Sequence, residues 1–299
     1  MARAPDLLYN KAVYEFTRKR GHEPMERIKR NERLAAMTRI LTSTPNRLYT
    51  LSEFTEMFGS AKSTISEDLS ILAAALRQFD LGRLTTVAGA AGGVVYRAIP
   101  SREKVISALN DLCRRLEKPG RVLPGDFLYT NDITCDADLC EVMGQILASR
   151  YYDRAPDFVL TMETKGIPVA MMTARALDVP LVIARRDSKA YEGSAVKINY
   201  ISGDGSDRIE TMALARRAVT PGQKALIIDD FMKGGGTLKG MHDLMKEFDV
   251  SVVGTGVVIA KAEPQKKRVD GVTSLLILEG VDRETGAARV VPSDWIYTM

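Results

Sequence analysis

The residues that could do chemistry gather in one short stretch of the C-terminal half. The run 224–228, which is apolar after its first residue, is typical of a buried strand, and Asp229 and Asp230 follow it directly, before a glycine loop at 234–236 and an amphipathic helix. A glycine loop that leads into a helix offers free backbone amides and the positive end of the helix dipole, which together bind phosphate. Two carboxylates beside a phosphate would repel it unless they accept hydrogen bonds from hydroxyl groups or hold Mg²⁺. The stretch therefore predicts a site for a ribose phosphate, which supplies both groups.

This stretch also resembles a known motif. The sequence from Ile227 to Asp230 and on through 235–237 is similar to the phosphoribosyl pyrophosphate (PRPP) motif of type I phosphoribosyltransferases. In that family the acidic pair binds the ribose hydroxyls and the loop binds the 5-phosphate. Residues 163–168 follow another apolar run and resemble the family's pyrophosphate loop. The resemblance implies that PRPP is bound by Thr164, Lys165, Gly166, Asp229, Asp230, Lys233, Gly234, Gly235, Gly236 and Thr237.

Two tyrosines are additional candidates for contact with PRPP. Tyr129 resembles an aromatic residue of the family's hood, which covers a bound ligand, although a tyrosine packed in the core is an equal alternative. Residues 185–208 contain Lys189, Lys197 and Tyr200 and lie where these proteins carry a mobile flap. An ordinary β-hairpin without ligand contact is the alternative for this segment.

Two departures from the family pattern concern catalysis. Purine phosphoribosyltransferases often have an acid at the position of Lys233, near the purine N7, and a threonine at that of Gly234. A lysine has the wrong charge to assist that base. We therefore expect a phosphoribosyltransferase-like fold without transferase activity or catalytic residues, in which PRPP, with or without Mg²⁺, is an effector and no cofactor is required. The three cysteines and two histidines form no metal-binding pattern, so no metal site is expected.

Apolar β-rich runs and helical segments alternate around these motifs. They occupy residues 158–161, 168–177, 181–184, 225–228, 238–248, 252–259 and 274–278. Such alternation indicates a parallel sheet covered by helices, and in open sheets of this kind ligands bind where the strands end. We therefore expect an α/β domain with a type I phosphoribosyltransferase-like parallel sheet.

The N-terminal third has a different character. Residues 1–97 carry 15 Lys and Arg against 10 Asp and Glu, a net charge of +5, whereas the rest of the chain carries 27 against 28. A capping box from Thr50 to Glu53 starts a short helix, and Ser60 or Ser63 can cap a second one. Strands near 83–87 and 94–96 follow. This order is typical of a winged helix-turn-helix domain.

A winged helix on a basic segment favours binding to double-stranded DNA over the alternative of a structural helical bundle. A helix over 28–41 would place two arginines together near one end, where they could neutralise phosphates. Glu67 and Asp68 are unfavourable beside DNA phosphates; one of them could accept a hydrogen bond from a cytosine amino group, but we expect both to face solvent. The predicted DNA-binding residues are Arg30, Arg33, Lys62, Ser63, Thr64, Ser66 and Arg83.

The order of the two predicted domains indicates a more specific family resemblance. A winged helix followed by a PRPP-binding domain with Asp-Asp-Phe-Met-Lys-Gly-Gly-Gly-Thr at 229–237 is similar to the purine operon repressor family of Gram-positive bacteria, from about residue 25 onward. The resemblance implies a homodimeric repressor that binds paired operator boxes upstream of purine genes and leaves them when PRPP rises. Two other functions stay open: a working purine phosphoribosyltransferase with an accessory nucleic-acid-binding domain, and an RNA-binding attenuator, which the wing and the recognition helix disfavour.

Length and composition limit the number of domains and the class of protein. A chain of 299 residues favours two domains, and we expect an optional basic extension at 1–24, a winged-helix domain at 25–98, a linker at 99–125 and an effector-binding domain at 126–299. With 45% hydrophobic and 27% charged residues, the composition is that of a globular protein. No apolar run reaches the roughly 18 residues of a membrane-spanning helix, and the N-terminus has charges where a signal peptide is apolar. We expect a cytoplasmic, nucleoid-associated protein without membrane partners.

Overall fold

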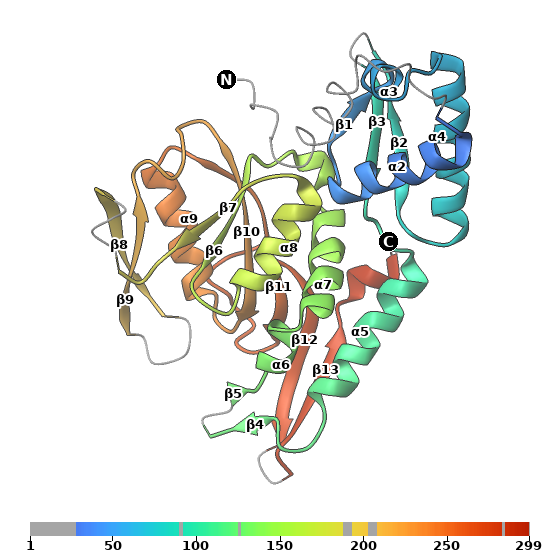
Figure 1. The fold of residues 1–299 in the computed structure, drawn as a ribbon. Helices are drawn as coiled ribbons and strands as arrows, with labels where there is room; N and C mark the ends of the chain where they lie inside the picture. The colour runs from blue at the N-terminus through green and yellow to red at the C-terminus, as the bar shows by residue number, and fades with distance from the viewer. Residues whose placement is uncertain are drawn as a thin grey trace. The chain divides into compact units, whose positions relative to one another are not determined.

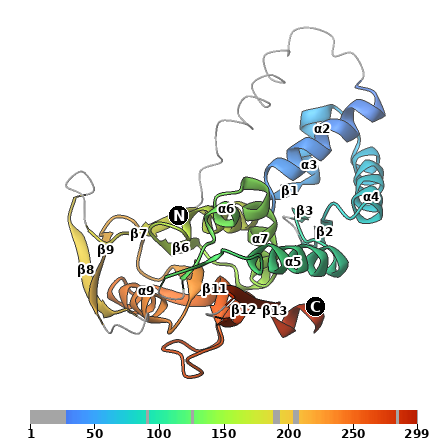
Figure 2. The same cartoon turned by 90° about the horizontal axis from the view of Figure 1, so that it is seen from below.

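The computed structural model describes residues 28–89, 92–124, 127–187, 193–202, 208–282 and 285–298 (Figures 1 and 2). The chain divides into two compact units after Arg97. Within the described residues, no helix has the length and apolar character needed to cross a membrane.

The first unit combines helices with a small antiparallel sheet. Its described elements are α2 (Arg30–Ser43), β1 (Leu48–Thr50), α3 (Leu51–Phe58), α4 (Lys62–Gln78), β2 (Arg83–Val87) and β3 (Gly93–Arg97). Strand β3 lies between β1 and β2 and pairs with both in antiparallel fashion. The side chains of Met37, Leu41, Tyr49, Phe54 and Ile65 are fully buried between the helices and the sheet. The unit is a winged helix-turn-helix, in which α3 and α4 form the helix pair and β2 and β3 form the wing, as predicted.

The two helices of the pair begin in different ways. The capping box of α3 is formed as predicted: Thr50 Oγ1 accepts the Glu53 amide at 3.2 Å, and Glu53 Oε2 accepts the Thr50 amide at 2.6 Å. Neither Ser60 nor Ser63 caps α4, whose N-cap residue is Ala61. The prediction of a serine cap is wrong because the Ser60 hydroxyl donates to a carbonyl at the end of α3 instead.

The second unit is a sheet with helices on both faces. In chain order, its described elements are α5 (Arg102–Leu116), β4 (Val122–Leu123), β5 (Phe127–Leu128), α6 (Asn131–Thr134), α7 (Ala137–Ser149), η1 (Tyr152–Arg154), β6 (Phe158–Met162), α8 (Ile167–Leu177), β7 (Leu181–Ala184), β8 (Ala195–Ile201), β9 (Ile209–Ala215), β10 (Lys224–Met232), α9 (Gly236–Glu247), β11 (Ser251–Lys261), β12 (Thr273–Asp282), β13 (Ala287–Pro292) and η3 (Asp294–Thr298). The main sheet has the order β13-β12-β11-β10-β6-β7. Its neighbouring strands are parallel except β12 and β13, which confirms the predicted parallel-sheet class.

Successive residues of β10 belong to two different cores, because side chains alternate across a strand. Leu226 and Ile228 pack in the cluster that includes α7 and α8, whereas Ala225 and Ile227 pack in the cluster that includes α9 and the β8–β9 hairpin. The sheet is therefore covered on both faces, and β10 lies in its middle (Figure 1).

Residues 99–125 differ from the linker that the sequence predicts. Helix α5 buries Val105, Leu109, Leu112 and Leu116, which recur at helical spacing, in the same cluster as α7 and β13. Because this apolar stripe packs against the sheet, α5 belongs to the core of the second unit rather than to a connection between units.

Candidate functional site

The acidic pair lies in the C-terminal half of the central strand, β10. Asp229 and Asp230 come just after the residues of β10 that pair with β6. Asp229 is only 7% exposed, and its Oδ1 accepts the backbone amide of Asp230 at 3.0 Å. Burial raises the pKa of both carboxyl groups; the charge of Asp230 raises that of Asp229 further, whereas the Lys165 ammonium acts to lower that of Asp230. Ionisation of this pair is costly, and a ligand with hydroxyl groups or positive charge would relieve that cost.

The loop after β6 approaches the acidic pair closely. A Cβ atom on Gly166 would collide with Asp229 Oδ1 and lie 2.6 Å from Thr161 Oγ1, so glycine is required at this position. Thr161 is fully buried, and its hydroxyl has no partner among the described residues. Lys165 is exposed in the same loop. The two motifs are thus brought together around an unsatisfied hydroxyl, although they lie more than sixty residues apart in the sequence.

The glycine loop joins β10 to the start of α9. Gly234, Gly235 and Gly236 are buried, and Gly235 is the N-cap residue of α9 with a φ of 82°, a conformation that favours glycine. Because Gly235 has no side chain, the N-cap residue supplies no side-chain acceptor to the first amides of α9. Thr237, in the first turn, is partly buried. The first amides of a helix have no partner within the helix, so this end of α9 is suited to a phosphate group.

The segment after β11 packs on the glycine loop, a contact that the sequence does not predict. Lys267 Nζ donates to the carbonyl oxygens of Lys233 and Lys261, both at 2.7 Å, and burial lowers the pKa of Lys267. The amide of Arg268 donates to the Gly234 carbonyl at 3.0 Å. The sequence feature that could have indicated this contact is the basic run at 266–268, which follows β11, a strand next to β10. This segment adds positive charge beside the glycine loop.

Tyr200 lies in the β8–β9 hairpin and packs against α9. Its side chain is 8% exposed, and a Cβ atom on Gly240 of α9 would lie 2.9 Å from the tyrosine ring. The Tyr200 hydroxyl donates to Glu210 Oε2 at 2.6 Å. Burial and the Glu210 carboxylate raise the pKa of Tyr200, and a hydrogen bond with Thr237 opposes them. Tyr200 therefore reaches the glycine-loop end of α9 as part of a packed hairpin.

Tyr129 follows β5 and is 42% exposed, so the alternative of a packed core tyrosine is wrong. The Arg121 guanidinium lies 6.0 Å from the centre of its ring and donates to its carbonyl oxygen at 3.1 Å. Figure 1 shows the β4–β5 hairpin at the end of the sheet toward which the parallel strands run. Tyr129 therefore presents an exposed aromatic ring directly after this hairpin.

The other residues of the second unit that the sequence suggested for ligand binding add little to the site. Lys197 forms an ion pair with Asp187 at 3.1 Å, and Lys189 lies outside the described residues. In the part of the chain that the structure describes, no group of three or more His, Cys, Asp or Glu side chains could hold a metal ion.

The first unit presents five of the predicted DNA-binding residues on its surface. Lys62, Ser63 and Ser66 are exposed in the first turns of α4, and Thr64 is partly exposed. Arg83 is exposed at the start of β2. The N-terminal half of the second helix in such a pair is the part that reaches base edges in the major groove.

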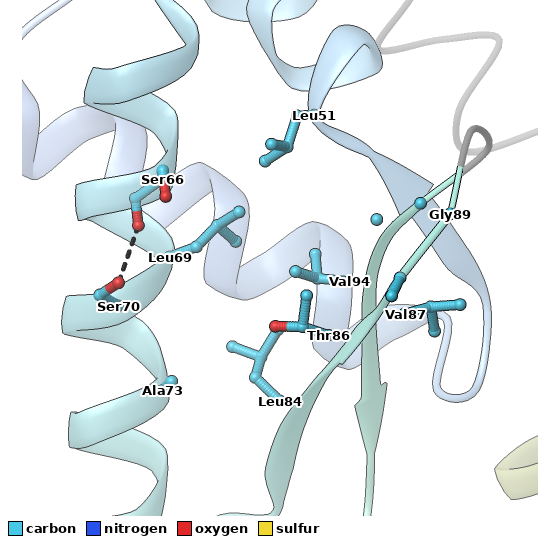
Figure 3. Close-up of a pocket in the computed structure, with 13 residues that line it drawn as sticks. Leu51, Ser66, Leu69, Ser70, Ala73, Leu84, Thr86, Val87, Gly89 and Val94 are labelled. Carbon is cyan, nitrogen blue, oxygen red and sulfur yellow. Dashed lines mark hydrogen bonds between the residues drawn. The ribbon is translucent and has the colours of Figure 1, made fainter.

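A groove separates α4 from the wing (Figure 3). Ser66 and Ser70 line it from α4, and Thr86 and Val94 line it from the wing strands. The Ser70 hydroxyl donates to the Ser66 carbonyl at 2.9 Å, so one of the lining hydroxyls is used within the helix.

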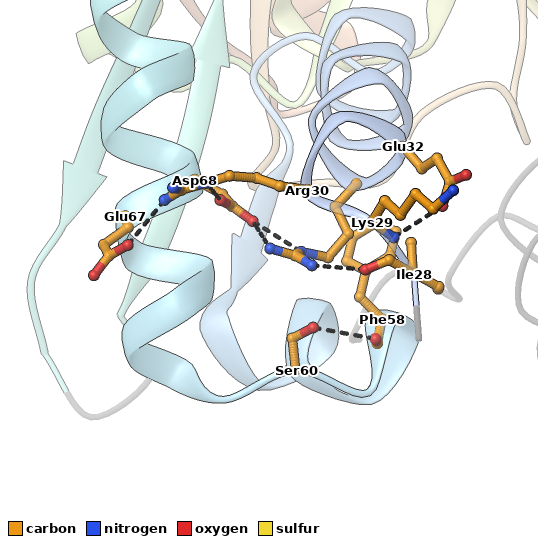
Figure 4. A network of polar contacts seen from close by, with 9 residues as sticks. Ile28, Lys29, Arg30, Glu32, Phe58, Ser60, Glu67 and Asp68 are labelled. Atoms are coloured by element: carbon orange, nitrogen blue, oxygen red, sulfur yellow. Dashed lines mark hydrogen bonds and ion pairs between the residues drawn. The ribbon is translucent and has the colours of Figure 1, made fainter. Parts of the chain in front are cut away.

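The predictions that Arg33 contacts DNA and that Asp68 faces solvent are wrong. Asp68 is fully buried rather than solvent-facing, and its Oδ2 accepts a hydrogen bond from Arg33 Nε at 2.9 Å (Figure 4). The Arg33 side chain is 8% exposed and also donates to the Ile28 carbonyl at 2.9 Å. Arg33 therefore joins α2 to α4 instead of facing a phosphate, because leaving a buried carboxylate unpaired is costly. Arg30 is half-exposed and bridges Asp68 and Glu67.

Comparisons with known proteins agree with both units. Residues 29–98 match the family "Bacterial purine repressor, N-terminal", and residues 137–289 match the "Phosphoribosyl transferase domain". An adenine phosphoribosyltransferase of Giardia lamblia, solved with 9-deazaadenine, shares the fold of the second unit: the TM-score is 0.50 and the identity 20%, over 57% of this chain and 98% of that one.

Regulators of purine biosynthesis match along most of the chain. The purine biosynthesis transcriptional repressor of Bacillus subtilis is 42% identical over 264 residues, which are 88% of this chain and 92% of that protein. The purine biosynthesis transcriptional activator of Lactococcus lactis subsp. lactis is 38% identical over 255 residues, which are 85% of this chain and 94% of that protein. The chain, with its winged-helix unit followed by a phosphoribosyltransferase-like unit, therefore belongs to the family of bacterial purine biosynthesis transcriptional regulators.

Proposed function

We propose that the protein is a repressor that binds double-stranded operator DNA of purine biosynthesis genes and is released when PRPP binds. The DNA-binding face is the outer surface of α4 with the adjoining wing, where Lys62, Ser63, Ser66 and Arg83 are exposed. The Bacillus subtilis relative is named a repressor and the Lactococcus lactis relative an activator of purine biosynthesis. We assign repression because the identity to the named repressor is the higher of the two.

The observation that supports PRPP as the ligand is the convergence of three chemically distinct groups at the end of β10. Asp229 and Asp230 supply acceptors for the two ribose hydroxyls, and the first amides of α9 supply donors for the 5-phosphate. The loop at 164–166, which contacts Asp229 through Gly166, brings the Lys165 ammonium for the diphosphate. The unpartnered Thr161 hydroxyl is a further donor beside them. Any Mg²⁺ would enter bound to the diphosphate oxygens, so a metal site built from protein side chains is not required.

The same site is proposed to bind PRPP without transferring its ribose. Lys233, at the position that would face the purine, is a cation, and its carbonyl holds a second lysine, Lys267. Positive charge here opposes protonation at N7 and cannot take the role of a carboxyl general acid or base. Incubation with PRPP and hypoxanthine, guanine, xanthine, adenine or uracil should release no pyrophosphate above background. Turnover of about 1 to 10³ per second would instead establish an active phosphoribosyltransferase with an accessory nucleic-acid-binding unit.

The decisive experiment is titration of the full-length protein against labelled DNA from upstream of a purine biosynthesis operon, with and without PRPP. Wild-type protein should bind this DNA more tightly than a scrambled duplex and lose affinity when PRPP is added, since a ligand shifts an equilibrium only through different affinities for the two states. The double variant Asp229→Ala, Asp230→Ala should bind with near-normal affinity and ignore PRPP. Equal binding to both duplexes would refute the DNA-binding function, and PRPP release of the double variant would refute the site.

The proposal includes a homodimer, because a protein that binds paired operator boxes, as the resemblance implies, would present one recognition helix to each box. Light scattering after size-exclusion chromatography should give about twice the chain mass of 32.9 kDa. A monomer that binds a single box with full affinity would contradict this part of the proposal.

A further inference from the structure

The recognition helix carries one exposed carboxylate. Glu67 occupies the sixth position of α4, and the other acidic residue of this helix, Asp68, is buried beneath it. Ser63 lies one turn before Glu67 and Ser70 one turn after it, and both are exposed. Glu67 therefore shares the outer face of α4 with side chains that, on the proposed function, face DNA.

Arg30 from α2 holds this carboxylate in place. Arg30 donates from NH2 to Glu67 Oε2 and from Nε to Asp68 Oδ1, both at 2.8 Å (Figure 4). The orientation of the Arg30 guanidinium is thus set by a buried carboxylate, which Arg33 fixes from the other side at 2.9 Å. Hydrogen bonds to Asp68 and then to Glu67 raise the pKa of Arg30 above its usual value, so the guanidinium remains charged. A continuous chain of charged pairs therefore connects the interior of the unit to the Glu67 side chain.

This network of ion pairs determines which chemical groups on DNA the exposed Glu67 carboxylate can bind. Two guanidinium groups and two carboxylates offset one another, so the cluster contributes no net attraction for phosphate. A carboxylate that approaches the DNA backbone is repelled, whereas one directed at base edges can accept from an amino group. Arg30 occupies Glu67 Oε2, which leaves Oε1 as the acceptor that points away from Arg30 (Figure 4). A single acceptor fits the cytosine N4 amino group, because adenine places its N7 acceptor beside the amino donor.

We propose that Glu67, positioned by Arg30, reads the amino group of a cytosine in the major groove of the operator. This inference rests on the proposed DNA-binding function. Glu67 is the specificity-determining contact, and Arg30 is a positioning residue that acts through it. An arginine is required at residue 30 because its planar group donates to two carboxylates at once, whereas a lysine supplies a single point charge.

Selection of bound sequences from a random pool of double-stranded DNA tests the proposal with the full-length protein. The wild-type motif should contain a position at which cytosine is preferred over thymine by about tenfold or more. Glu67→Gln should lose that preference at that one position and favour adenine, whose N6 and N7 match an amide. Arg30→Lys should weaken the preference at the same position. Glu56→Gln removes an exposed carboxylate of the same charge from α3 and should leave the motif unchanged.

The outcomes separate this inference from the proposed function. If the wild-type protein enriches no motif, the DNA-binding function and the inference both fail. If the wild-type protein enriches a motif and the Glu67→Gln variant has the same base preference at every position of that motif, the inference alone fails. Glu67 then has only an electrostatic or structural role. Equal melting temperatures of the variants and the wild-type protein establish that each variant is folded. If Glu67→Gln does not fold, the position-specific effect of Arg30→Lys decides the same question.

Discussion

At the scale of single residues, Asp229 and Asp230 are carboxylates placed where their charge is unfavourable. Burial raises the pKa of both, and the neighbouring charge raises that of Asp229 further. An acid whose pKa rises on folding stabilises the protein below its unfolded pKa and loses that contribution as the pH rises through the folded pKa. The stability that the pair contributes at low pH therefore falls as the pH rises, as expected of groups kept for ligand binding.

We predict that Asp229→Asn melts at a higher temperature than the wild-type protein at pH 7, because the amide removes the buried charge. The advantage should shrink as the pH falls through the raised pKa of Asp229 toward about 4. Thermal melts across this range check the prediction, and Asp270→Asn, at an exposed loop position, is the matched control. A variant less stable than wild type at pH 7 would mean that the carboxylate supports the fold.

Lys62 and Arg83 are the exposed cations predicted to contact phosphates. Each phosphate contact contributes about one unit to the slope of log affinity against log salt concentration. Lys62→Ala and Arg83→Ala should therefore each weaken operator binding and flatten the slope by about one unit. Arg175→Ala, which removes an exposed cation from α8, should leave the slope unchanged. Slopes equal to wild type in both variants would exclude these residues from the interface.

Arg33 belongs to the same unit but should behave as a structural residue. Arg33→Ala leaves buried Asp68 with only half-exposed Arg30 as an ion-pair partner, and loss of one partner of a buried pair costs about 3–5 kcal/mol. Replacement of both by apolar residues, as in Arg33→Met with Asp68→Leu, should recover most of that loss. Urea unfolding measures both variants. A single variant as stable as wild type would show that the pair does not hold α2 to α4.

At the scale of elements, the loop between β6 and α8 depends on the absence of a side chain at Gly166. A Cβ atom there would collide with Asp229 and lie 2.6 Å from the Thr161 hydroxyl. Gly166→Ala should weaken PRPP binding at least tenfold by calorimetry and lower stability by about 1–3 kcal/mol through overpacking. Gly280→Ala in β12 is the matched control, since a Cβ atom there has nothing within 4 Å. Normal PRPP binding by Gly166→Ala would place the ligand elsewhere.

At the scale of the whole molecule, two units with separate cores should unfold in two steps, and PRPP should stabilise only the second. A ligand at 100 times its dissociation constant adds about 2.7 kcal/mol to the unit that binds it. The single tryptophan, Trp295, lies in η3 of the second unit and packs under the Arg150 guanidinium, 4.9 Å from its ring. Its fluorescence should report a melting temperature that rises with PRPP, while the other calorimetric transition stays constant. A PRPP shift in Asp229→Ala, Asp230→Ala would contradict the assignment.

The features that were predictable from the sequence are those whose physical causes lie within a few residues of one another. The capping box at Thr50 and Glu53 needs only a hydroxyl and a carboxylate three positions apart. The strand, acidic pair, glycine loop and helix from 224 to 247 are contiguous, so their order predicted both the parallel sheet and the chemistry at the end of β10. Alternation of apolar segments was sufficient for the fold class because periodicity reports which face of an element is buried.

The tertiary structure alone decided which charged groups face a partner and which face solvent. Arg33 and Asp68 are separated by 35 positions, and Lys267 and Lys233 by 34, so nothing in their local sequence marks one partner for the other. The approach of Gly166 to Asp229 and the packing of α5 on the sheet arise in the same way. A charged side chain can be buried only where the fold supplies its counter-charge or carbonyl groups, and that pairing depends on distances across the folded chain rather than along it.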